Sequence, residues 1–148
     1  MQLLIDAGIG LLSLVVLAAP QPVVLPDLAA RTVAEGTDSG VSEFRQVTVR
    51  AVEEWRALWS AHSSEPAPQV DFSRSVAVGV FLGSRPTAGF RVEITRVTIE
   101  GDRAVVQFVE HRPEADAILA QVITAPFHVV TLPSVVLTIT FQQLEPRR

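Results

Sequence analysis

The sequence predicts an α+β domain in which one amphipathic helix packs on a curved antiparallel β-sheet of about five to six strands. Two observations support this fold class. One helical stripe carries both tryptophans, and six short runs of strand-forming residues surround it. Short links between the later runs favour antiparallel neighbours, and an apolar helix stripe has to be buried against another element. With 148 residues, the chain is long enough for one such core.

The helix is predicted over residues 49–62. Val52, Trp55, Trp59 and His62 recur at spacings of three and four, which places them on one face. Two glutamates fall in the first turn, where the helix dipole favours carboxylates. Successive helix residues do not share a face, so these glutamates are not a catalytic carboxylate pair. The tryptophans could form a platform for a small ligand, but at this spacing they are more often part of a core.

The strands are predicted from apolar runs and from alternation of apolar and polar residues. They cover residues 44–49, 75–82, 90–99, 103–111, 126–132 and 135–144. Between Ile94 and Val97 the apolar residues change parity, which indicates a β-bulge near Thr95–Arg96. Residues 112–122 are compatible with a short helix or with irregular chain.

The first 40 residues are predicted to precede the domain, which then spans residues 41–148. Residues 7–19 form an uninterrupted run of small and apolar side chains. This run is short for a bilayer-spanning helix and fits the core of a signal peptide. Residues 1–19 are therefore predicted as a signal peptide or an apolar N-terminal segment, and residues 20–40, with three prolines and two glycines, as a linker.

A signal peptide predicts export to the periplasm, the cell surface or the medium. Contact with a membrane would then involve only the N-terminal segment, if that segment stays uncleaved. Asp6 stands where a signal peptide carries a positive charge, so a buried N-terminal helix or strand remains the alternative.

The composition excludes several classes of function. The net charge is −4, and no basic patch is visible of the kind that nucleic-acid binding requires. The chain has no cysteine, which excludes a disulfide, a thiol nucleophile and a thiolate metal site. All 12 basic residues are arginines, which is typical of a GC-rich, bacterial genome.

No catalytic or metal-binding motif is present. The three histidines, His62, His111 and His128, lie on different predicted elements without metal-ligand spacing. They are interpreted as the end of the helix stripe, an exposed strand terminus and an imidazole bonded to backbone. No G-x-S-x-G elbow accompanies the serines. The sequence therefore predicts a protein that is not an enzyme and has neither metal nor cofactor.

The most specific stretch is the loop "LGSRPTAGFRV", residues 82–92, between two predicted strands. Pro86 lacks an N–H and cannot pair there as a strand. Gly83 and Gly89 allow backbone geometries that other residues avoid, and Phe90 is expected to return the chain to the core. Such a preformed loop suits a binding partner, since a rigid loop loses little entropy on association.

Arg85 allows two interpretations of this loop. Its guanidinium has a planar set of donors suited to a carboxylate or to carbonyl oxygens. It could pin the loop to the domain itself, through Asp71 or Glu93. Alternatively, it could be presented to a partner together with the rest of the loop.

Three further segments are informative in their order along the chain: "EEWRALWSAH", "VDFSRSVAVGVFLGSRPTAGFRVEI" and "APFHVV". Together they resemble the C-terminal domain of PrcB-type proteins, which are subunits of bacterial protease complexes, and the resemblance covers roughly residues 43–142. It implies a non-catalytic, exported module that stabilises or accompanies a partner protein, a protease. The family usually has glycine where this chain has Ala88, and often tyrosine at Phe127. An alanine at positive φ would cost about 1 kcal/mol or more.

A second, shorter resemblance supplies the alternative function. The stretch "RPTAGF" is similar to the N-P-T-T-G-aromatic loop of chagasin-like inhibitors, which have an immunoglobulin-like fold and insert this loop into a cysteine protease. It implies protease inhibition through the Arg85–Phe90 loop. The chain lacks that family's second Gly-rich loop and adds a Trp-bearing helix. For either function, the predicted partner-binding residues are Gly83, Arg85, Pro86, Thr87, Gly89, Phe90, Pro126, Phe127 and His128.

Overall fold

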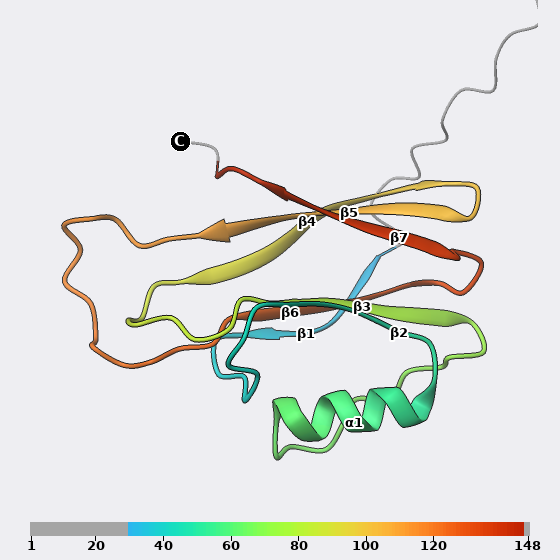
Figure 1. Cartoon of the computed structure of the whole chain (residues 1–148), viewed down its shortest axis with the longest axis horizontal. Coiled ribbons are helices and arrows are strands. Elements are labelled where there is room, and N and C mark those ends of the chain that lie inside the picture. The colour runs from blue at the N-terminus through green and yellow to red at the C-terminus, as the bar shows by residue number, and fades with distance from the viewer. Residues whose placement is uncertain (1–29, 147–148) are drawn as a thin grey trace, which may run out of the picture.

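The structure, a computed structural model, describes residues 30–146 and has three layers (Figure 1). Helix α1 (Val52–His62) covers one face of a four-stranded sheet, and a three-stranded sheet packs on the other face. The strands are β1 (Arg31–Gly36), β2 (Arg45–Val49), β3 (Ser75–Phe81), β4 (Arg91–Glu100), β5 (Arg103–His111), β6 (Phe127–Pro133) and β7 (Thr138–Leu144).

The larger sheet has the order β1-β6-β3-β2 with antiparallel pairs throughout, and the smaller sheet has the order β4-β5-β7. In the smaller sheet, β4 and β5 are antiparallel while β5 and β7 are parallel. The α+β class with one packing helix is confirmed. The single antiparallel sheet of five to six strands is wrong, because short links do not show whether the next strand pairs in the same sheet. The β3–β4 link crosses from one sheet to the other. Along the chain, β6 of the larger sheet lies between β5 and β7, although these two strands are neighbours in the smaller sheet.

The alternation of β3 explains the layers. Val76, Val78 and Val80 belong to the core between the two sheets. Ala77 and Phe81 face the other way, into the core under the helix. Both faces of β3 are therefore covered, as its continuous apolar sequence indicates.

The helix packs through the predicted stripe, with one exception. Trp55, Trp59 and His62 are buried, whereas Val52 at the helix start is 39% exposed. The indole Nε1 of Trp55 donates to the Pro68 carbonyl over 2.9 Å, so the segment after the helix folds back along it. The tryptophans are thus core residues and do not form an exposed ligand platform.

The predicted linker is wrong over part of its length. Strand β1 lies within residues 20–40 and pairs antiparallel with β6. Strand β1 has only two apolar side chains, Val33 and Ala34, and both pack against the core. Because these two are neighbours in the chain and do not alternate with polar residues, the sequence of β1 has no strand periodicity, and pairing with β6 defines this edge strand. Residues 20–29 and the predicted signal segment, 1–19, lie outside the described residues. Within residues 30–146, no helix is long and apolar enough to cross a bilayer.

The predicted bulge is confirmed, since the β4–β5 register shifts between Ile94 and Arg96. Ile94 and Val97 both pack against the core, and the two residues between them, Thr95 and Arg96, are exposed. The ambiguous segment 112–122 is irregular chain with one turn rather than a helix.

Candidate functional site

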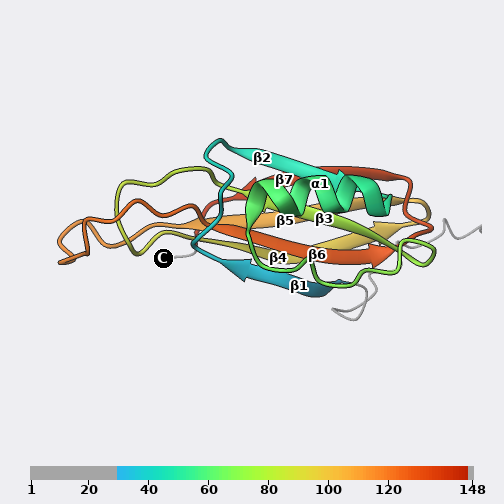
Figure 2. The same cartoon turned by 90° about the horizontal axis from the view of Figure 1, so that it is seen from below.

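Two loops run together beyond one end of the sheets (Figure 2). They are residues 82–90 and residues 112–125, and we call them the loop pair. The Arg85 N–H donates to the Thr124 carbonyl over 2.7 Å, and the Thr124 N–H donates back to Arg85 over 3.0 Å. Farther out, the Ala88 N–H donates to the Ala120 carbonyl over 3.1 Å. Each loop therefore supports the other through main-chain hydrogen bonds.

The two predicted glycines do allow the turn geometry of the first loop. Gly83 has φ +75° and Gly89 has φ +90°. A Cβ on Gly83 would lie 2.7 Å from the Ser42 carbonyl oxygen, so the backbones also approach closely there. Ala88 adopts no positive φ, because glycines alone have positive φ in residues 30–146. The strain considered for Ala88 is therefore absent.

Arg85 pins the loop to its own domain. Its Nε donates to Oε1 of Glu110 over 3.1 Å, and its Nη1 donates to the Leu82 carbonyl over 2.8 Å. The Glu110 side chain is only 8% exposed and that of Arg85 23% exposed. The intramolecular interpretation of Arg85 is thus the one that the structure supports. The expected partners Asp71 and Glu93 are wrong, since Glu110 on β5 takes that place.

The remaining predicted residues fall into two groups. Pro86 and Gly89 are exposed in the loop pair, and Thr87 and Phe90 are half-buried there. Three others, Pro126, Phe127 and His128, are buried. As a partner-binding surface these three are wrong, because their side chains are buried. Phe127 and His128 lie on β6, which runs between β1 and β3, and Pro126 directly precedes that strand. Gly83 is also buried, and its positive φ shapes the start of the loop.

His128 joins three strands. Its Nδ1 accepts the Ile94 N–H of β4 over 2.9 Å, and its Nε2 lies 3.0 Å from Oγ1 of Thr32 on β1. Since Nδ1 accepts, the neutral ring carries its proton on Nε2 and donates it to Thr32. The prediction that backbone satisfies this imidazole is confirmed. Burial lowers the pKa of His128 below its usual value, although the Glu35 carboxylate, 3.6 Å from Nε2, opposes that shift.

The other histidines lie apart from His128. His62 packs against the rings of Trp59 and Phe127 and hydrogen-bonds Ser39, and burial lowers its pKa as well. His111 is half-buried at the end of β5, with its Nε2 2.9 Å from the Glu93 carboxylate. Across residues 30–146, no three side chains of metal-ligating type gather at one place.

We expect the chain to lose stability as the pH falls from about 7.5 to 5.5. In this range the unfolded chain binds protons on His62 and His128, whose folded pKa values lie below the unfolded value of 6.5. The unfolded state then binds more protons, so its free energy falls relative to that of the folded state. Urea unfolding across this range checks the direction, and H128Q should show a smaller pH dependence than wild type. A flat profile for wild type would contradict the assignment.

The exposed part of the loop pair includes residues that the sequence did not single out. Ile118, Val122 and Ile123 are exposed by 103%, 52% and 79%. Sequence reasoning missed them because Ile118 and Val122 are four residues apart and fit the inner face of the short helix considered for 112–122. The signal that could have indicated their exposure is the presence of three aliphatic side chains in a segment without a clear helix or strand period.

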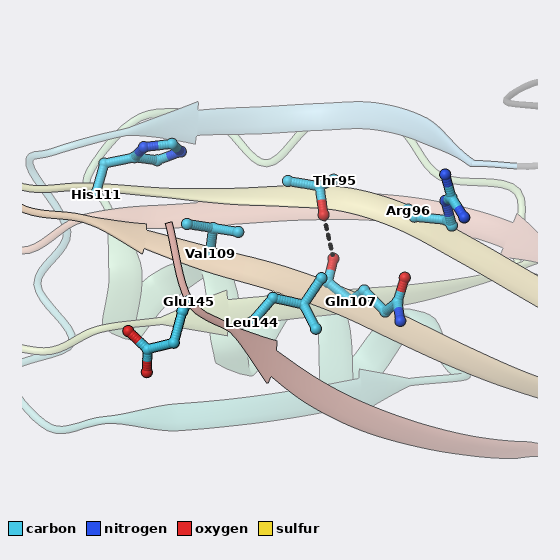
Figure 3. A pocket seen from close by; sticks show the side chains of 7 residues that line it. All are labelled: Thr95, Arg96, Gln107, Val109, His111, Leu144 and Glu145. Carbon is cyan, nitrogen blue, oxygen red and sulfur yellow. Dashed lines mark hydrogen bonds between the residues drawn. The ribbon is translucent and has the colours of Figure 1, made fainter. Parts of the chain in front are cut away.

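A hollow of about 420 Å³ lies on the outer face of the three-stranded sheet (Figure 3). The residues that line it are Thr95, Arg96, Gln107, Val109, His111, Leu144 and Glu145. The β4 bulge brings two neighbouring polar residues to its rim, and Thr95 Oγ1 donates to the Gln107 carbonyl over 3.3 Å. His111 connects it to the start of the second loop. The hollow therefore offers polar groups beside the loop pair.

Comparison with known proteins gives one match. Residues 76–133 match the family described as PrcB C-terminal. The match runs from β3 to β6 and includes the whole loop pair, but not the helix. No curated protein and no solved structure is significantly similar to the chain. The match over residues 76–133 therefore supports the predicted resemblance to the PrcB C-terminal family.

Proposed function

We propose that the protein is a non-catalytic, exported interaction module that stabilises or accompanies a partner protein, a protease, and that the loop pair is the binding surface. One observation carries this proposal. Three aliphatic side chains, Ile118, Val122 and Ile123, are exposed on loops held by main-chain hydrogen bonds and by the Arg85–Glu110 ion pair. The match to the PrcB C-terminal family supports a role in a protease complex.

The loop pair combines exposed apolar area with a main chain held by hydrogen bonds. The three exposed aliphatic side chains lie within six residues of the chain, and exposed apolar surface of this kind is typical of interaction sites. Loops that are already ordered lose less entropy on binding. Residues 113–125 contain Glu114 and Asp116 but no basic residue. The nearby cations Arg85 and Arg112 both contact Glu110, at 3.1 and 3.5 Å. The surface thus suits an apolar groove with a basic rim.

We expect the double variant I118S/I123S to lose the partner without losing stability. Both side chains are largely exposed, so their replacement should change the free energy of unfolding by no more than about 0.5 kcal/mol. Recovery of the partner should fall at least about tenfold, because about 1.4 kcal/mol of lost binding free energy has that effect. The measurement is affinity purification from the native host, with mass spectrometry of the proteins recovered and a thermal melt.

The matched control is V135S/L137S. These side chains are 68% and 65% exposed in the turn before β7, away from the loop pair. Replacing both by serine should leave the recovery of the partner unchanged. Equal loss in both variants would remove the loop pair as the binding surface, and a recovered partner set without a protease would refute the proposed partner class.

Protease inhibition is the second candidate function. The structure does place two neighbouring loops at one end of a two-sheet sandwich, and Pro86 and Gly89 are exposed at that end. An inhibitor of the chagasin type would use the Arg85–Phe90 loop in a protease cleft. Assays of cysteine and serine proteases with the purified protein distinguish the two functions, and no inhibition at micromolar protein removes this one.

A further inference from the structure

The β7 edge of the three-stranded sheet is unlike the other sheet edges in residues 30–146. The edge strands are β1 and β2 in one sheet and β4 and β7 in the other. From the absence of any protection on β7, we propose that β7 pairs antiparallel with β7 of a second copy of the chain. The two three-stranded sheets would then form one continuous sheet across a two-fold axis.

The other three edges carry features that discourage pairing with another chain. Charged side chains, bulges and short length all have this effect. Strands β1 and β4 each contain a register shift, and they carry two and four charged residues respectively. Strand β2 has five residues and begins with Arg45. Each of these edges therefore has at least one obstacle to an added strand.

Strand β7 has none of these obstacles. Its sequence, TITFQQL, contains no charge, proline or glycine, and its pairing with β5 is regular over all seven residues. Ile139 and Phe141 pack against the core and remain half-exposed at the edge. A strand added beside β7 would cover both side chains and pair with backbone groups that have no strand partner on that side within residues 30–146.

The strand is also complementary to itself. With the two-fold axis at Phe141, each Phe141 lies opposite its copy, and Thr140 lies opposite Gln142 of the other chain. Aromatic pairs across strands are favourable, and this register brings no charges together. Self-complementarity is what an isologous interface requires, which is why a second copy is the occupant we propose. The antiparallel arrangement directs the two loop pairs in opposite directions, so this inference does not depend on the proposed function.

The test is the mass of the full chain in solution at tens of micromolar, by light scattering after gel filtration. Wild type should have twice the 16.0 kDa of one chain. The variant T140K/Q142K places lysines opposite each other and should raise the dimer dissociation constant at least tenfold. The matched control is Q46K/T48K on β2, which introduces the same two changes at exposed positions of another edge strand. The control should remain dimeric.

A monomeric wild type would overturn the proposal, and so would a dimer that both variants leave intact or weaken equally. If T140K/Q142K fails to fold, disulfide cross-linking of a cysteine variant tests the same register. Because the chain has no cysteine, T140C/Q142C introduces the only thiols, and the proposed register predicts an oxidised, disulfide-linked dimer. Failure of oxidised T140C/Q142C to form that dimer would overturn the register.

Discussion

Replacing Arg85 by alanine is expected to lower the free energy of unfolding by about 3 kcal/mol, because it leaves the buried Glu110 carboxylate without its main partner. The guanidinium also donates to the Leu82 carbonyl, so a second hydrogen bond is lost. Urea or thermal unfolding measures the loss. R85A should weaken partner binding only through this destabilisation, since Arg85 is turned toward its own domain.

Arg91 provides the matched control for that experiment. Its ion pair with Glu93 has the same 3.1 Å separation, but the side chains are 58% and 40% exposed. R91A should therefore cost no more than about 0.5 kcal/mol. Removing the buried carboxylate as well, in R85A/E110L, should restore part of the stability lost in R85A. An R85A variant as stable as R91A would show that the buried pair does not brace the loop.

Gly83 to alanine is expected to destabilise the chain by about 3 kcal/mol, the sum of a left-handed backbone penalty of about 1–2 kcal/mol and an overpacking term of similar size. Gly83 has φ +75°, and an added Cβ would lie 2.7 Å from the backbone of Ser42 and Glu43. Backbone cannot rotate away as a flexible side chain can, so the loop itself has to shift. Chemical unfolding measures the stability, and the loss of partner recovery should follow it.

Gly101 separates the two contributions. It has φ +63°, but no atom lies within 4 Å of the position that a Cβ would take. G101A should therefore cost only about 1–2 kcal/mol, the backbone penalty alone. Equal losses in G83A and G101A would mean that close approach at Gly83 contributes nothing, and that the loop is looser than its contacts indicate.

The sequence was informative wherever local chemistry decides the structure. The helix and its buried stripe follow from a spacing of three and four residues, and the β4 bulge follows from a change of parity. The need for Gly83 and Gly89 follows from the conformational freedom that only glycine has. These features depend on neighbouring residues, so they can be predicted without knowledge of the fold.

The candidate site was predicted less well, and the errors have one cause. The sequence predicts Pro126, Phe127 and His128 on a surface, but all three are buried where the chain enters β6, between β1 and β3. Ile118 and Ile123 were overlooked, because their exposure depends on a loop that no helix or strand period describes. In both cases burial is set by what packs on a segment, and that information does not lie within the segment.

By itself, the sequence determined one helix, most of the strands, the turn chemistry of the first loop and the resemblance that residues 76–133 confirm. The tertiary structure decided that the strands form two sheets, that β7 runs parallel to β5, and that Glu110 is the partner of Arg85. The physical reason is the range of the interactions. Periodicity and backbone preferences act over a few residues, whereas sheet membership and ion pairing join residues that lie far apart in the chain, such as Arg85 and Glu110.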